Sequence, residues 1–127
     1  MTAGQKKVLL VEDDRFLRRA CEKSLRQQGF DVTTAADGAE GLDAVRRDMP
    51  DVVLLDLLMP KVSGIEVLRA LKADQSTRDL PVIVLSNSSR AEDREEVAAL
   101  GVVSYLVKSN LSLKELGDQI RKLFEPS

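Results

Sequence analysis

The sequence has 127 residues, of which 43% are hydrophobic and 31% charged, with a formal net charge of -2 at pH 7. These values are typical of one soluble globular domain and argue against a disordered chain. The sequence contains neither a basic tract for nucleic-acid binding nor an apolar run long enough to span a bilayer. We therefore expect a single domain over residues 1–127, with its core at about residues 6–124 and no direct nucleic-acid or membrane partner.

Five short apolar segments are predicted as strands. The runs within residues 6–11, 52–56 and 82–85 are continuous rather than alternating, which is typical of strands that are buried on both faces. Residues 30–34 and 102–107 supply two further strands.

Segments with helical periodicity alternate with these strands. The predicted helices cover residues 15–28, 37–49, 64–73, 89–100 and 112–123. In the second of them, Leu42, Val45 and Met49 are expected on the buried side. The alternation predicts an α/β fold, a doubly wound five-stranded parallel sheet with five helices, and the flavodoxin-like strand order 2-1-3-4-5 is the usual choice.

The chain has one cysteine and no histidine. Cys21 cannot form an internal disulfide, and the first residues lack an apolar signal segment, so we expect a cytoplasmic protein. Cys21 also lies on the apolar side of a helical pattern, which favours a small core residue over a redox site. Any histidine that takes part in the chemistry of this chain must come from a partner.

Polar side chains stand at four predicted strand ends. They are Glu12 and Asp13 after the first strand, Asp56 at the end of the third, Ser86 after the fourth and Lys108 after the fifth. In the expected strand order these ends converge. Carboxylates that lie close together need a compensating cation, and Mg²⁺ suits oxygen ligands best. Asp56 could then accept a phosphoryl group that Lys108 and Ser86 help to bind.

Each of these residues also has an ordinary structural interpretation. Acids are common at the start of a helix, which is how we interpret Asp14. Ser86 could be a turn residue, Lys108 a surface charge and Asp56 a helix cap or loop residue. We favour a functional site because suitable side chains occur at the ends of four strands that are neighbours in the expected order 2-1-3-4-5.

Four segments carry a resemblance to a known family: residues 11–14 (VEDD), residues 56–60 (DLLMP) with Gly64, residues 84–86 (VLS) and residues 105–108 (YLVK). On these segments, the chain resembles a response-regulator receiver domain of two-component signalling, a family that includes the single-domain chemotaxis regulator. The resemblance implies that Asp56 accepts a phosphoryl group from a histidine kinase or phosphotransfer protein. It implies a signalling switch that catalyses only its own phosphorylation and dephosphorylation, not an enzyme that acts on other substrates.

The resemblance also implies how the metal is held. Asp13 and Asp56 would bind Mg²⁺ directly, and Glu12 would bind it through a water molecule. The backbone carbonyl of Leu58 would complete the protein ligands.

The remaining matched residues are implied to act on the phosphoryl group and the output surface. Ser86 and Lys108 would contact the phosphoryl group. Tyr105 would turn inward when Ser86 shifts toward that phosphoryl group. The ordinary alternative is that Tyr105 is a surface aromatic residue. The face of the fourth helix, fifth strand and fifth helix would bind an unidentified downstream protein. The chain would be a monomer or a dimer that forms on phosphorylation.

The sequence departs from the family after Lys108, where Ser109 replaces the usual proline that follows a cis peptide. A non-proline cis bond costs roughly 3 kcal/mol. We therefore expect a trans bond, or a strained cis bond held by its surroundings, and the reach of Lys108 stays open.

Three other functions are weighed against this one. A phosphohydrolase of the haloacid dehalogenase type would need a second acid at position 58, which is Leu58. A flavin-binding electron carrier would need a phosphate loop where Glu12, Asp13 and Asp14 repel phosphate. A scaffold that is never phosphorylated would not need the acidic cluster.

Overall fold

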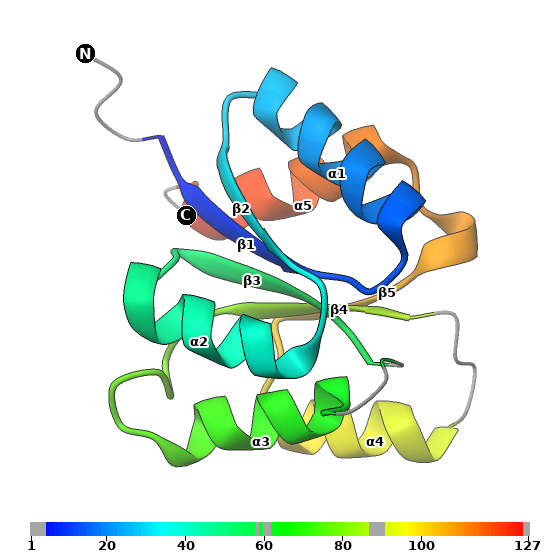
Figure 1. The fold of residues 1–127 in the computed structure, drawn as a ribbon. Coiled ribbons are helices and arrows are strands. Elements are labelled where there is room, and N and C mark those ends of the chain that lie inside the picture. The colour runs from blue at the N-terminus through cyan, green and yellow to red at the C-terminus, as the bar shows by residue number, and fades with distance from the viewer. Residues whose placement is uncertain (1–4, 58, 60–61, 87–90, 126–127) are drawn as a thin grey trace.

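The protein is described by a computed structural model over residues 5–57, 59, 62–86 and 91–125. Its sheet has five parallel strands in the order β2-β1-β3-β4-β5 (Figure 1). The strands are β1 (Lys7–Val11), β2 (Asp31–Ala35), β3 (Val52–Asp56), β4 (Val82–Ser86) and β5 (Ser104–Val107). The predicted fold class and strand order are therefore confirmed.

Helices cover both faces of the sheet (Figure 1). Helices α1 (Arg15–Gln27) and α5 (Leu113–Phe124) lie on one face, and α2 (Gly38–Asp48), α3 (Gly64–Ala73) and α4 (Ala91–Ala99) lie on the other. Side chains alternate along each strand, so every strand contributes to two apolar clusters, one on each face. None of the helices in the described ranges is long and apolar enough to cross a membrane.

Two predicted details are wrong. Strand β5 begins at Ser104, two positions later than expected, and Val103 before it is 47% exposed. Met49 was expected on the buried side of α2 but is 48% exposed. Its φ of 42° takes the chain out of the helical path, so its side chain leaves the apolar stripe that Val45 belongs to.

Helix α3 begins directly against the end of β3. Ser63 and Glu66 form a capping box, and the Gly64 amide donates a hydrogen bond of 3.0 Å to the Leu57 carbonyl. A Cβ atom on Gly64 would lie only 2.2 Å from the Asp56 carbonyl oxygen. The lack of a side chain at Gly64 therefore lets α3 approach the strand that carries Asp56.

We expect Gly64→Ala to lower the free energy of unfolding by about 3 kcal/mol, because the added methyl group meets backbone atoms that cannot move aside cheaply. Urea denaturation measures this loss. Gly29→Ala is the comparison, since Gly29 has a φ of 97° but no atom within 4 Å of the added carbon. That variant should lose only about 1 kcal/mol from backbone strain. A smaller loss for Gly64→Ala than for Gly29→Ala would contradict the steric account.

Candidate functional site

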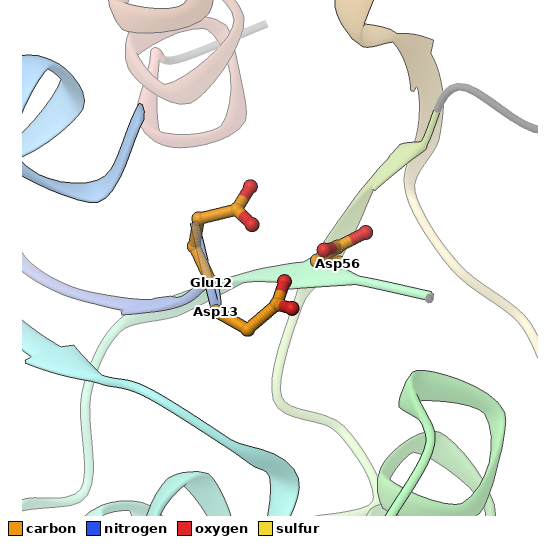
Figure 2. Close-up of side chains that lie close together, drawn as sticks. All are labelled: Glu12, Asp13 and Asp56. Atoms are coloured by element: carbon orange, nitrogen blue, oxygen red, sulfur yellow. The ribbon is translucent and has the colours of Figure 1, made fainter. Parts of the chain in front are cut away.

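Three carboxylates meet where β1 and β3 end (Figure 2). Glu12 and Asp13 follow β1, and Asp56 is the last residue of the neighbouring strand β3. One oxygen of each carboxylate lies within 4.8 Å of the other two. Glu12 and Asp56 are buried, whereas Asp13 is exposed. The predicted convergence of acids from the first and third strands is therefore observed, with Asp13 on the solvent side.

The backbone around Glu12 holds this acid in place. The Asp14 amide donates a hydrogen bond of 3.1 Å to Glu12 Oε2, and Arg18 Nη1 donates one of 2.9 Å to the Glu12 carbonyl. Asp14 itself caps α1, since its side chain accepts hydrogen bonds from the amides of Phe16 and Leu17. Asp14 is thus a structural residue, as expected, and Glu12 belongs to the site.

Lys108 joins the two buried acids. Its Nζ lies 2.6 Å from Glu12 Oε1 and 3.1 Å from Asp56 Oδ2, and its side chain is only 15% exposed. Lys108 begins a short 3₁₀ turn that the sequence analysis did not predict. The peptide bond from Lys108 to Ser109 is trans, because the described residues contain no cis bond. The serine after Lys108 therefore leaves this side chain able to reach the acids.

Burial and charge set the protonation of this cluster. The pKa of Asp56 is raised to about 7, mainly by burial and next by repulsion from Glu12, while attraction to Lys108 partly opposes both. Burial by itself lowers the pKa of Lys108, but its contacts with Glu12 and Asp56 outweigh burial and raise it above the usual value. Lys108 therefore stays charged at neutral pH. Its single positive charge stands against a cluster of three acids.

The donor set fits a hard divalent cation. Mg²⁺ binds oxygen ligands at about 2.1 Å, so any two oxygens on one ion lie no more than about 4.2 Å apart. One carboxylate oxygen each from Glu12, Asp13 and Asp56 lies within 4.8 Å of the other two, so small side-chain movements would bring all three within that limit. A cation would also supply the positive charge that Lys108 alone does not. These three residues could therefore hold Mg²⁺.

The other predicted residues lie at different distances from the cluster. Ser86 is fully buried at the end of β4, one position beyond Leu85, which pairs with Asp56. Tyr105 lies further from that edge, because it pairs with Val84. Leu58 lies outside the described residues. The structure thus places Ser86 beside the acids along the sheet edge and Tyr105 deeper along β5.

Cys21 is a core residue, as predicted. It is 2% exposed in the apolar cluster between the sheet and helices α1 and α5, and burial is the main cause that raises its thiol pKa to about 11. A pKa two units above the ordinary value of 9.0 leaves about a hundredfold less thiolate at pH 8.

We therefore expect Cys21 to react with iodoacetamide at least about 100-fold more slowly in the folded chain than in urea. Mass spectrometry of the quenched reaction follows both rates, with a cysteine peptide as the control for the reagent. Equal rates in the two states would contradict the buried position.

The chain matches the family model described as "Response regulator receiver domain" over residues 8–121. It is 39% identical to "Probable transcriptional regulator ycf27" of Porphyridium aerugineum, over 94% of this chain and 48% of the relative. It is 40% identical to "Transcriptional regulatory protein PrrA" of Mycobacterium tuberculosis, over 92% of this chain and 49% of the relative. The chain spans about half the length of these curated relatives.

Solved structures show the same fold. The chemotaxis protein CheY4 of Vibrio cholerae superposes with a TM-score of 0.88 at 28% identity, covering 95% of this chain and 100% of that one. The receiver domain of the Francisella response regulator 1452 gives 0.85 at 31% identity, covering 94% and 96%. The sheet order, the acids at the ends of β1 and β3, and these matches all indicate the same family. The chain belongs to the response-regulator receiver family of two-component signalling.

Proposed function

We propose that this chain is a phosphorylation-controlled switch in which Asp56 accepts a phosphoryl group from a histidine on a kinase or phosphotransfer protein. The observation that supports this most is the contact of Lys108 with both Glu12 and Asp56, with Asp13 at the solvent side. This arrangement holds a buried nucleophile next to groups that bind anions and cations. The chain has no histidine, so the donor is a separate protein or domain.

The transfer exchanges one bond to phosphorus for another. An ionised oxygen of Asp56 attacks the phosphorus atom, and the new P–O bond forms as the P–N bond to the donor imidazole breaks. The imidazole leaves with the electron pair of that bond and takes up a proton from solvent. Attack by water on the resulting acyl phosphate later returns Asp56 and inorganic phosphate. Asp56 must be ionised to react, so its raised pKa opposes transfer until a cation is present.

Asp13 and Asp56 would bind Mg²⁺ directly, and Glu12 would do so through a water molecule. Leu58, whose carbonyl the sequence analysis assigned to the metal, lies outside the described residues. Bound Mg²⁺ would neutralise the acids and bind phosphoryl oxygens. The residues of the chain supply the alignment, since Glu12 is fixed by the Asp14 amide and Asp56 by its position at the end of β3.

Lys108 and Ser86 would bind the new phosphoryl oxygens. Lys108 would exchange its contact with the Asp56 carboxylate for one with the phosphoryl group, and Ser86 would donate its hydroxyl hydrogen. The shift of Ser86 would let Tyr105 turn inward and change the surface formed by α4, β5 and α5. A downstream protein that binds one form of this surface more tightly reads the signal.

We also propose that residues 1–127 act as one receiver domain, with its core at about residues 6–124, in the cytoplasm. Its output would be a protein contact or a dimer that forms on phosphorylation. The curated relatives named as transcriptional regulators are about twice as long as this chain. Their regulatory role belongs to the longer proteins, so we do not assign a direct contact with DNA to this domain.

Replacement of Lys108 tests the proposed chemistry. We expect Lys108→Met to slow phosphorylation by acetyl phosphate and Mg²⁺ about 100-fold, because one donor to the transferred group is lost. Intact-protein mass spectrometry measures the gain of a phosphoryl group over time. Lys114→Met, at an exposed position on α5, is the matched control and should react like the native chain. A native rate in Lys108→Met would exclude a role for this ammonium group in the transfer.

A further inference from the structure

Helix α4 has little apolar surface with which to attach itself to the sheet. Its sequence, AEDREEVAA, has no apolar stripe. Of the α4 side chains whose burial the structure describes, only Val97 is fully buried. Leu100, just beyond its end, is partly buried against the same cluster. Because most helices in proteins are held by a packed apolar face, α4 must depend strongly on other contacts for its position.

In the described part of α4, two polar side-chain contacts supplement the packing of Val97. The guanidinium carbon of Arg94 lies 5.0 Å from the centroid of the Tyr105 ring on β5. Glu96 forms an ion pair with Arg69 on α3. Tyr105 is half-buried and packs against the apolar cluster on this face, so the cation lies over a ring that is already partly held. One contact therefore connects α4 to β5, and the other connects it to α3.

The Tyr105 ring lies on the strand that reaches the candidate site. Tyr105 and Val107 are two positions apart and so point to the same face of β5. Val107 pairs with Ser86, which ends β4 next to Asp56. A movement of Ser86 therefore acts on its paired residue, Val107, which lies two positions from Tyr105 on the same strand.

We infer that Arg94 is a positioning residue, which holds the Tyr105 ring against α4 and makes its inward movement harder. This inference rests on the proposed function, in which Tyr105 turns inward on phosphorylation. The cation attracts the face of the ring in its present place, and inward movement breaks that contact. An exposed contact of this kind changes such an equilibrium about two- to fivefold. Arg94 therefore sets how much phosphorylation is needed to switch the surface.

The amino-acid composition of the chain allows this contact to be measured directly by fluorescence. Tyr105 is the single tyrosine and the sequence has no tryptophan, so tyrosine fluorescence reports on this ring. We compare acrylamide quenching of the native chain with that of Arg94→Gln and Arg94→Lys, without metal or phosphoryl mimic. The matched control is Arg69→Gln, which removes the ion pair between α4 and α3 and leaves Arg94 in place.

We expect a higher quenching constant in Arg94→Gln, an intermediate value in Arg94→Lys and a native value in Arg69→Gln. A native value in Arg94→Gln would overturn the inference. An equal rise in Arg69→Gln and Arg94→Gln would also overturn it, because general loosening of α4 would then explain the result. Circular dichroism of each variant establishes that the fold is intact.

A second measurement connects the contact to switching. Beryllofluoride with Mg²⁺ mimics the phosphoryl group, and its half-saturating concentration should fall about two- to fivefold in Arg94→Gln. An unchanged or higher concentration would overturn the regulatory part of the inference. Failure of the native chain to bind the mimic would instead contradict the proposed function, while the quenching data still decide whether Arg94 holds Tyr105.

Discussion

Asp56→Asn is expected to abolish phosphorylation of this chain by acetyl phosphate and Mg²⁺. The amide has no ionised oxygen to attack phosphorus, and it also removes one acid from the candidate metal site. The side chain keeps almost the same size and stays at the end of β3, so the fold should be preserved. Intact-protein mass spectrometry under conditions that fully modify the native chain measures the loss, which should exceed about 1,000-fold in rate.

Asp14→Asn is the matched control for this result. Asp14 lies two residues from Glu12 but caps α1 through its own side chain, and asparagine caps helices equally well. This variant should be phosphorylated at the native rate. Equal phosphorylation of Asp56→Asn and Asp14→Asn would show that another residue accepts the group.

The metal-free chain is expected to lose stability as the pH rises from about 4 to about 7. Asp56 has a pKa of 3.8 as its ordinary value and about 7 in the folded chain, so the folded state binds more protons across this interval. The stabilisation is complete below the ordinary pKa and is lost as the pH passes through the folded pKa. A shift of this size corresponds to at most about 4 kcal/mol. Urea denaturation in the presence of a chelator measures it.

Magnesium should reverse this loss. Binding of a cation to the folded state alone adds about 2.7 kcal/mol at a concentration 100 times its dissociation constant. Asp56→Asn should remove most of the pH dependence and make the metal-free chain more stable than the native sequence at pH 8, because no charged carboxylate is then buried at position 56 and its repulsion by Glu12 is gone. A native chain whose stability is constant over this pH range, or unaffected by magnesium at pH 8, would contradict the electrostatic description of the site.

The sequence predicted the fold well because its strands are continuous apolar runs. The apolar runs at residues 52–55 and 82–85 are typical of strands in the middle of a covered parallel sheet, and both are buried in the structure. The errors in the prediction lie at the ends of elements, where the backbone torsion of a single residue decides whether the element continues. Met49 adopts a positive φ, which periodicity does not show. The capping box of Ser63 and Glu66, in contrast, has a clear S-x-x-E signature in the sequence.

The candidate site was predictable in part for a similar reason. The ends of parallel strands meet at one edge, so strand order places Glu12, Asp13 and Asp56 together without any knowledge of side-chain angles. The contact of Lys108 with Glu12 was not predicted, because a long flexible side chain can reach several partners from one backbone position. Arg18 was also missed. Its contact with the Glu12 carbonyl has no sequence signal, since arginine on a helix is common and usually faces solvent.

The most direct measurement is the location of the phosphoryl group in the chain. Borohydride reduces an aspartyl phosphate to homoserine, so peptide mass spectrometry after reaction with acetyl phosphate and Mg²⁺ identifies the acceptor residue. The account predicts homoserine at position 56 alone, and none when a chelator replaces magnesium. Homoserine at Asp13 or another acid, or equal modification without the metal, would contradict it.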